Sequence, residues 1–289
     1  MRKVVVIGAN GQLGTDVVAA FTTAGDEVCG LCHSHIEIAE FNSVRNVLAG
    51  IRPEIIINTA AMHDVESCET HPEQAYAVNG AGAKHLALIA QEMGAVIMHV
   101  STDYVFDGAK AAPYEEDDPP RPLNVYGNTK LSGEQFIQSI ADRHFVLRTS
   151  AVYGRSPCRA KGGRNFVELM LKLAADGREI RVVASEHVTP TSTRELARQI
   201  VLLSRSDAYG LYHATPEGSC SWHAFAREIF NITNTKVNLQ VAGPHEFPAK
   251  VPRPEYSVLE NRALKACGLS AFQPWQAGLR LYLRDRTAA

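Results

Sequence analysis

A glycine-rich turn close to the start of the chain constrains the fold most. The β-branched apolar run of residues 3–7 breaks into Gly8-Ala9-Asn10-Gly11-Gln12-Leu13-Gly14, and an apolar pattern with helical spacing follows. Strand, glycine turn and helix in this order form the first half of a nucleotide-binding βαβ unit. Gly8 would make the turn, Gly11 would let the backbone approach a pyrophosphate, and Gly14 would let helix and strand pack closely. A glycine triplet alone is equally compatible with a structural turn, but its position between a strand and a helix favours a dinucleotide site.

Strands and helices alternate after this unit. Further strands are expected at residues 27–31, 54–58, 96–100 and 145–148, with helices at 41–50, 72–94 and 126–140. This alternation predicts an α/β protein with a Rossmann-type, doubly wound parallel sheet and a smaller C-terminal substrate-binding domain. We expect residues 1–153 to form the dinucleotide-binding domain and residues 154–289 to form mainly the substrate-binding region, with residues of about 179–213 returning to the first domain.

Composition excludes several classes of partner. The 289 residues are 45% hydrophobic and 21% charged, with a formal net charge of −2, so nucleic acid and membranes are not expected as partners. The first apolar run is too short for a signal peptide, and no later run approaches the roughly 18 residues of a spanning helix, so the chain is expected to be cytoplasmic. Cys29 and Cys32 have the spacing of a metal motif, but they would point to opposite faces of a strand and no second ligand pair follows. No metal is expected.

A tyrosine and a lysine form the candidate catalytic pair. If a helix begins at Tyr126, Lys130 follows at i+4 on the same face, and an ammonium near a phenol favours the phenolate. Thr102, at the end of an expected strand, would supply a third group. A surface pair is the commoner origin of this spacing, but its position after a nucleotide-binding unit favours a proton-transfer site.

The second expected strand leaves the cofactor open. A carboxylate at its end would favour NAD and an arginine would favour NADP, but the sequence continues as Cys32-His33-Ser34-His35. Either NADPH or NADH is therefore expected.

Longer motifs identify a family. The chain resembles the dTDP-4-dehydrorhamnose reductases of the extended short-chain dehydrogenase/reductase superfamily over essentially its whole length. The glycine turn and Tyr-x-x-x-Lys specify only the superfamily, whereas the runs at 101–108 and 122–127 are far more specific. The segments that carry the resemblance are residues 8–14, 52–61, 101–108, 122–134, 163–167 and 253–259.

The resemblance implies a role for each site residue. Gly11, Gln12 and Leu13 would hold the pyrophosphate, and Tyr126 and Lys130 would reach the nicotinamide ribose. The remaining implied contacts are Glu37 and Ile38 at the adenine, Ala61, Met62 and His63 beside the nicotinamide, and Thr102, Asp103, Tyr104, Ala151 and Asn165 at the substrate.

The implied reaction is hydride transfer from NAD(P)H to the C4 ketone of a nucleotide-linked 4-keto-6-deoxy sugar, most simply dTDP-4-dehydrorhamnose to dTDP-rhamnose, in deoxysugar and cell-surface polysaccharide biosynthesis. Tyr126 would protonate the developing alkoxide, Lys130 would lower the pKa of the tyrosine, and Thr102 would hydrogen-bond the reacting oxygen. The resemblance also implies a homodimer. A non-catalytic, dinucleotide-binding regulatory subunit of the same fold is the alternative, which the complete Thr–Tyr–Lys set disfavours. An epimerase or dehydratase would need further carboxylates beside Thr102.

Two positions depart from the family. Ala151 stands where the family commonly has a tryptophan against the sugar, and losing that wall would weaken sugar binding by roughly 1–3 kcal/mol or admit a different sugar. His63-Asp64 replaces a small polar residue and an alanine, so His63 would be either a proton relay or, more commonly, a packed histidine. These departures concern the identity of the sugar and not the class of reaction.

Overall fold

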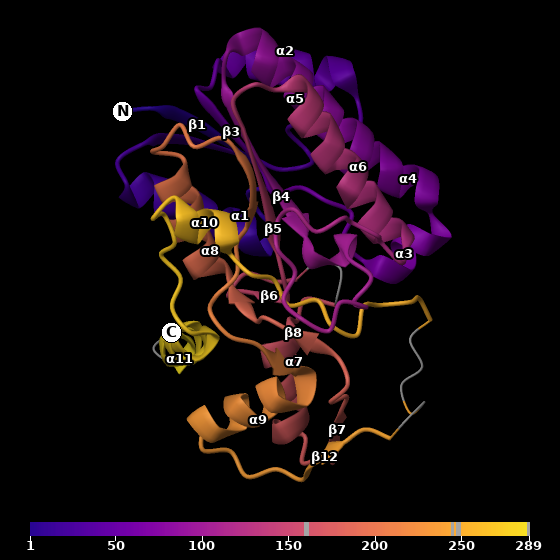
Figure 1. The fold of residues 1–289 in the computed structure, drawn as a ribbon. Coiled ribbons are helices and arrows are strands. Elements are labelled where there is room, and N and C mark those ends of the chain that lie inside the picture. The colour runs from indigo at the N-terminus through magenta and orange to yellow at the C-terminus, as the bar shows by residue number, and fades with distance from the viewer. Residues whose placement is uncertain (159–161, 244–245, 247–249, 288–289) are drawn as a thin grey trace.

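Six parallel strands form the central sheet of the protein (Figure 1). The computed structural model describes residues 1–158, 162–243, 246 and 250–287. The strands lie in the order β10-β5-β4-β3-β1-β2, and every neighbouring pair is parallel. They are β1 (Lys3–Ile7), β2 (Glu27–Leu31), β3 (Ile55–Asn58), β4 (Val96–Thr102), β5 (His144–Thr149) and β10 (Gly210–His213). The expected parallel, doubly wound α/β fold is confirmed.

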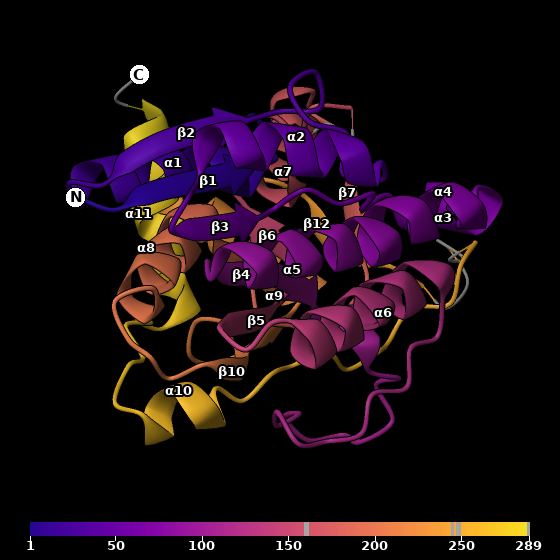
Figure 2. The same ribbon diagram turned by 90° about the horizontal axis from the view of Figure 1, so that it is seen from above.

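Helices cover both faces of this sheet, as Figure 2 shows. Successive side chains of a strand point to opposite faces, so Val4 and Val6 pack on one side and Val5 and Ile7 on the other. The first face is covered by α1 (Gln12–Thr23) and α8 (Thr193–Leu203), and the second by α2 (Phe41–Ile51), α5 (Gly82–Met93) and α6 (Val125–Ile140). Strands buried on both faces explain why the sequence shows continuous apolar runs rather than alternation.

The strand order reverses direction at β1. The chain passes from β1 to β2 on one side, and β3 then pairs with the other side of β1. In open α/β sheets, such a switch point leaves a crevice at the carboxyl ends of the strands, where ligands bind.

A smaller lobe lies beyond one end of the sheet (Figure 1). Its core packs Tyr153, Val167, Phe225, Trp275 and Leu279 together. The lobe is built from α7 (Phe166–Ala175), α9 (Trp222–Ile232), α11 (Trp275–Thr287), β7 (Ile180–Val182) and β12 (Leu239–Val241).

Short elements connect the two parts. The strand pairs β6 (Val152–Tyr153) with β9 (Thr191–Ser192) and β8 (His187–Val188) with β11 (Cys220–Ser221) lie between them, and α10 (Arg262–Ala266) packs on β10. Within 179–213, β7 pairs with β12 of the lobe, whereas α8 and β10 lie against the main sheet. The division into a dinucleotide-binding and a substrate-binding domain stays a prediction.

A π-helical turn interrupts the helix expected at 72–94. The structure has α3 (Val65–Thr70), α4 (Pro72–Tyr76), the π-helical turn η1 (Ala77–Ala81) and then α5. Such turns occur frequently at functional sites. Across the described residues, none of the helices has the length and apolar character needed to span a bilayer.

Candidate active site

One cavity of about 580 Å³ lies at the carboxyl ends of the strands and extends to the smaller lobe. All the residues expected in the site line this cavity, although they lie far apart in the sequence. They are Gly8, Gly11, Gln12, Leu13, Gly14, Glu37, Ile38, Ala61, Met62, His63, Thr102, Asp103, Tyr104, Tyr126, Lys130, Ala151 and Asn165. The structure thus brings the set together, and the role of each member stays a prediction.

The glycine turn fits a pyrophosphate. Gly8 has a φ of 82°, and a Cβ there would stand 2.8 Å from Thr59 Oγ1. A Cβ at Gly14 would stand 2.1 Å from the Gly8 carbonyl oxygen, so only glycine allows this approach of helix and strand. Gly11 caps α1 without a side-chain hydrogen bond, and no acidic residue stands in the first turn. The amide groups that begin α1 are therefore suited to an anion.

Adding one methyl group at Gly14 tests this fit. We expect Gly14→Ala to lose about 1–3 kcal/mol of unfolding free energy through overpacking and to bind NADPH at least about fivefold more weakly. Urea unfolding and fluorescence titration with NADPH measure the two effects. Gly50→Ala in α2 is the matched control, because a Cβ there meets nothing within 4 Å. Equal behaviour of both variants would contradict the packing assigned to Gly14.

The end of the cavity that is expected to hold the adenine contains both a carboxylate and an imidazole. Glu37 Oε1 accepts a hydrogen bond from the Ala39 amide, and Oε2 lies 3.2 Å from His33 Nδ1. Ile38 is buried against Gly82. As the sequence indicated, neither a carboxylate nor an arginine directly follows β2.

Asn79 fixes the segment expected beside the nicotinamide. Its Oδ1 accepts from the Met62 amide and its Nδ2 donates to the Met62 carbonyl oxygen, both at 2.9 Å. Nδ2 also lies 3.0 Å from Thr129 Oγ1 in α6, the helix that carries Tyr126. Sequence reasoning assigned no role to Asn79. The available signal was a buried-type amide in the middle of an apolar helical pattern.

The expected helix begins one residue before Tyr126. Asn124 caps α6, because its Oδ1 accepts from the Gly127 amide at 2.8 Å. Gly127 is required here, since a Cβ would stand 2.2 Å from the Tyr104 carbonyl oxygen. The Tyr126 ring packs edge-on against the Tyr104 ring, with 5.9 Å between centroids. The helix start is thus locked onto the end of β4, which carries Thr102.

The electrostatics keep Tyr126 protonated. Burial raises its pKa well above the ordinary value, a hydrogen bond with Thr102 lowers the pKa, and the negative charge of Asp103 raises it. The sequence predicted that Lys130 lowers this pKa. In the structure, Lys130 Nζ donates to the Val100 carbonyl oxygen at 2.7 Å and lies 3.2 Å from His99 Nε2, and its effect on the pKa of Tyr126 stays a prediction. Tyr126 is therefore a neutral phenol with a proton to donate.

Asp103 organises the floor of the cavity. Its carboxylate accepts from the hydroxyls of Thr102, Ser150 and Ser257 at 3.1, 2.7 and 2.5 Å. Burial raises the pKa of Asp103, and these three hydrogen bonds lower it. The carboxylate thus joins the ends of β4 and β5 to the segment around Ser257 and holds the Thr102 hydroxyl in place.

Asn165 and Ala151 belong to the wall nearest the smaller lobe. Asn165 caps α7 by accepting from the Glu168 amide at 3.0 Å, and its Nδ2 donates to the Gly154 carbonyl oxygen at 2.8 Å. Ala151 has a left-handed backbone with a φ of 44°. The rings of Phe166 and Trp222, tilted by 46° with their centroids 4.7 Å apart, line the same cavity.

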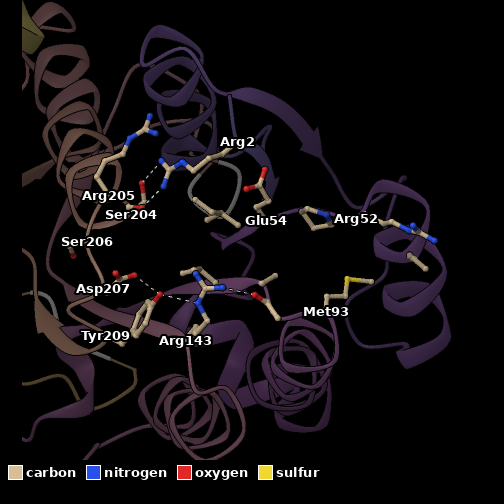
Figure 3. Close-up of a pocket in the computed structure, with 16 residues that line it drawn as sticks. Arg2, Arg52, Glu54, Met93, Arg143, Ser204, Arg205, Ser206, Asp207 and Tyr209 are labelled. Carbon is tan, nitrogen blue, oxygen red and sulfur yellow. Dashed lines mark hydrogen bonds between the residues drawn. The ribbon is translucent and has the colours of Figure 1, made fainter.

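A second cavity opens at the opposite, amino ends of the strands (Figure 3). Arg2 and Arg205 both pair with Asp26, and Arg143 donates to the Gly94 carbonyl oxygen. None of the expected site residues lines this cavity. The cavity at the carboxyl ends of the strands, which contains those residues, is therefore the candidate active site.

The fold and the first cavity define a dinucleotide-dependent oxidoreductase of the short-chain dehydrogenase type, with a glycine cradle at the switch point and Thr102, Tyr126 and Lys130 beside it. A family model described as the RmlD substrate binding domain matches residues 1–288, and the chain belongs to this family.

Several known proteins are similar to this chain over nearly its full length. The spore coat polysaccharide biosynthesis protein SpsK of Bacillus subtilis is 40% identical, over 100% of this chain and 99% of its own. A dTDP-4-dehydrorhamnose reductase structure from Clostridium acetobutylicum has a TM-score of 0.94 and 35% identity, covering 99% of both chains. Another, from Bacillus anthracis in complex with NADP, has a TM-score of 0.92 and 34% identity, covering 98% of both. The expected family, fold and oxidoreductase class are confirmed, and NADP in this relative belongs to the expected cofactor class.

Proposed function

We propose that the protein uses NADPH or NADH to reduce the C4 ketone of a nucleotide-linked 4-keto-6-deoxy sugar, with dTDP-4-dehydrorhamnose as the substrate and dTDP-rhamnose as the product. The observation that carries the proposal is the single cavity in which Tyr126, Thr102 and Lys130 lie together with the glycine cradle. Family membership and the names of the relatives support the sugar class.

The bound dinucleotide and the residues of the cavity have different chemical roles. The bound dinucleotide supplies the hydride, and the start of α1 holds its pyrophosphate. Tyr126 donates its proton to the oxygen that becomes an alkoxide, and the Thr102 hydroxyl, which donates to Asp103 Oδ1 in the ligand-free protein, turns to donate to the same oxygen. Lys130 as an ammonium stabilises the phenolate that Tyr126 becomes.

The biological setting forms part of the same proposal. SpsK of Bacillus subtilis is named for spore coat polysaccharide biosynthesis, which supports a role in making a deoxysugar for a surface polysaccharide. A cytoplasmic homodimer completes the proposal, as expected from the sequence.

Turnover with defined sugars tests the proposal. Purified protein is mixed with NADPH or NADH and with dTDP-4-keto-6-deoxy sugars that differ in configuration, and cofactor oxidation is followed by absorbance. We expect oxidation with at least one sugar and loss of its ketone. Tight dinucleotide binding without turnover of any sugar would instead support the non-catalytic regulatory alternative.

The hydroxyl of Thr102 has a test of its own. We expect Thr102→Val to lower kcat by about 100-fold, because a hydrogen-bond donor to the reacting oxygen is lost. Thr102→Ser retains the hydroxyl and is expected to stay within about tenfold of wild type. Steady-state kinetics with saturating cofactor measures both variants, and equal kcat values for valine and serine would remove Thr102 from the mechanism.

A further inference from the structure

A buried histidine connects Lys130 to the core of the sheet. His99 lies in the middle of β4, with its Nδ1 3.0 Å from Asn58 Nδ2 and its Nε2 3.2 Å from Lys130 Nζ. Asn58, His99 and Lys130 are 1%, 1% and 2% exposed, so the contacts of His99 with the other two side chains are buried. No sequence pattern indicates this chain of contacts, because a histidine in an apolar strand is most simply interpreted as a packed residue.

The hydrogen-bond partners of Asn58 determine which ring nitrogen of His99 carries the proton. The Ala60 amide is a donor and lies 3.1 Å from Asn58 Oδ1, so the side-chain oxygen of Asn58 faces Ala60 and its NH₂ group faces His99. An NH₂ group only donates, so His99 Nδ1 accepts and carries no proton. Burial, and then the nearby charge of Lys130, lower the pKa of His99 well below its ordinary value, which keeps the ring neutral. A neutral ring with a bare Nδ1 carries its proton on Nε2.

That proton points at Lys130. His99 Nε2–H can form a hydrogen bond with Nζ only if Nζ has a lone pair, which an ammonium lacks. Lys130 then donates one N–H to the Val100 carbonyl oxygen and accepts from His99. The orientation of the Asn58 amide thus favours an uncharged amine at Lys130, two groups along this chain of contacts.

The other charged groups around Lys130 only partly oppose its neutral amine form. Burial lowers the pKa of Lys130 to about 8, and the carboxylate of Glu134 raises it. Glu134 is itself neutralised by Arg148, whose Nη2 lies 2.7 Å from Glu134 Oε2. Tyr126, one turn earlier on α6, is a neutral phenol.

We propose that His99, oriented by Asn58, favours the neutral amine of Lys130 over the ammonium in the ligand-free protein, and that dinucleotide binding at alkaline pH takes up a proton from solvent at Lys130 Nζ. The inference rests on the proposed function only in placing the dinucleotide in this cavity. An ammonium needs acceptors for three N–H groups, and Val100 supplies one while His99 supplies none. Hydroxyl oxygens of a ligand beside Lys130 would supply the others and so favour the charged form.

Proton uptake has a defined pH dependence. Above its lowered pKa, Lys130 has lost its proton in the ligand-free protein. A ligand that restores the higher pKa makes the protein take this proton up. With a free pKa of about 8, binding should take up about 0.1 proton near pH 7, about 0.5 near pH 8 and about 0.9 near pH 9. Calorimetric titration of the full chain with NADPH, repeated in buffers of different ionisation enthalpy, measures this number.

Two variants separate His99 from a merely structural role. His99→Gln places a carbonyl oxygen where Nε2–H stands, and Asn58→Asp reverses the tautomer because its carboxylate accepts a hydrogen bond from Nδ1–H. Both offer Lys130 an acceptor, so uptake near pH 9 should fall below about 0.3 proton while NADPH still binds. His99→Gln adds no charge, so a loss seen only in Asn58→Asp would overturn the tautomer argument.

The tautomer is also directly observable. Nitrogen spectra of protein labelled at histidine should show Nε2–H and a bare Nδ1 for His99, assigned by the signal that disappears in His99→Gln. A proton on Nδ1, or wild-type binding near pH 9 without proton uptake, would overturn the proposal. Neither readout uses a sugar, so failure of sugar reduction would refute the proposed function and leave this inference standing.

Discussion

Replacing Tyr126 by phenylalanine is expected to lower kcat by about 10²–10⁴-fold, the usual contribution of a positioned general acid. The half-buried phenol is the protonated group that shares the cavity with Thr102 and the glycine cradle, and burial keeps its pKa high. Removing one oxygen leaves the ring contact with Tyr104 intact, so NADPH affinity should stay within a few-fold. Steady-state kinetics and fluorescence titration measure the two quantities.

Tyr104→Phe is the matched control for this prediction. Tyr104 lines the same cavity and packs against Tyr126, but its hydroxyl hydrogen-bonds with Arg253. We expect this variant to change KM more than kcat, with a loss of kcat below about tenfold. Full activity of Tyr126→Phe, or an equal loss of kcat in both variants, would show that the proton comes from another group.

Breaking the buried pair of Glu134 and Arg148 is expected to cost about 3–5 kcal/mol of unfolding free energy. Glu134 is fully buried, and Arg148 contacts it through Nε at 3.0 Å and Nη2 at 2.7 Å. Ser101 also donates to Glu134, and the Arg148 guanidinium lies 5.1 Å from the centre of the Phe106 ring. Glu134→Gln leaves the guanidinium buried without a countercharge, which urea unfolding at equilibrium would detect.

Two comparisons make the stability prediction specific. Asp176→Asn removes the exposed partner of Lys172 in α7 and should leave the free energy of unfolding nearly unchanged. The double variant Glu134→Leu with Arg148→Met should be more stable than Glu134→Gln alone, because no buried charge is left unpaired. A cost below about 1 kcal/mol for Glu134→Gln would contradict the role assigned to the pair.

The sheet could be predicted from the sequence because its strands are buried on both faces. A run such as Ile55–Asn58 must be a strand between two layers, and the glycine turn fixes which strand begins the nucleotide-binding unit. The π-helical turn η1 could not be predicted in the same way. It is stabilised by the hydrogen bonds of Asn79 to Met62, a contact between segments that no local pattern encodes.

The members of the site were predicted more fully than their states. The residues that the motifs and the family resemblance indicated all line one cavity, but the charge of each depends on partners from distant segments. The Asp103 carboxylate is engaged by Ser257, 154 positions away, and Lys130 faces a histidine whose proton position depends on Asn58. Burial and hydrogen-bond direction decide these states, and both require the tertiary structure.

Transfer of a labelled hydride tests the central claim most directly. Wild-type protein is incubated with dTDP-4-dehydrorhamnose and NADPH that carries deuterium at the transferable position of the nicotinamide, and the sugar product is analysed by NMR and mass spectrometry. The proposed site predicts one deuterium per product molecule, located at C4 of the sugar, with one NADPH consumed for each. Consumption of NADPH without deuterium at C4, or an unchanged ketone in the presence of bound NADPH, would contradict the assignment of this cavity as a 4-ketoreductase site.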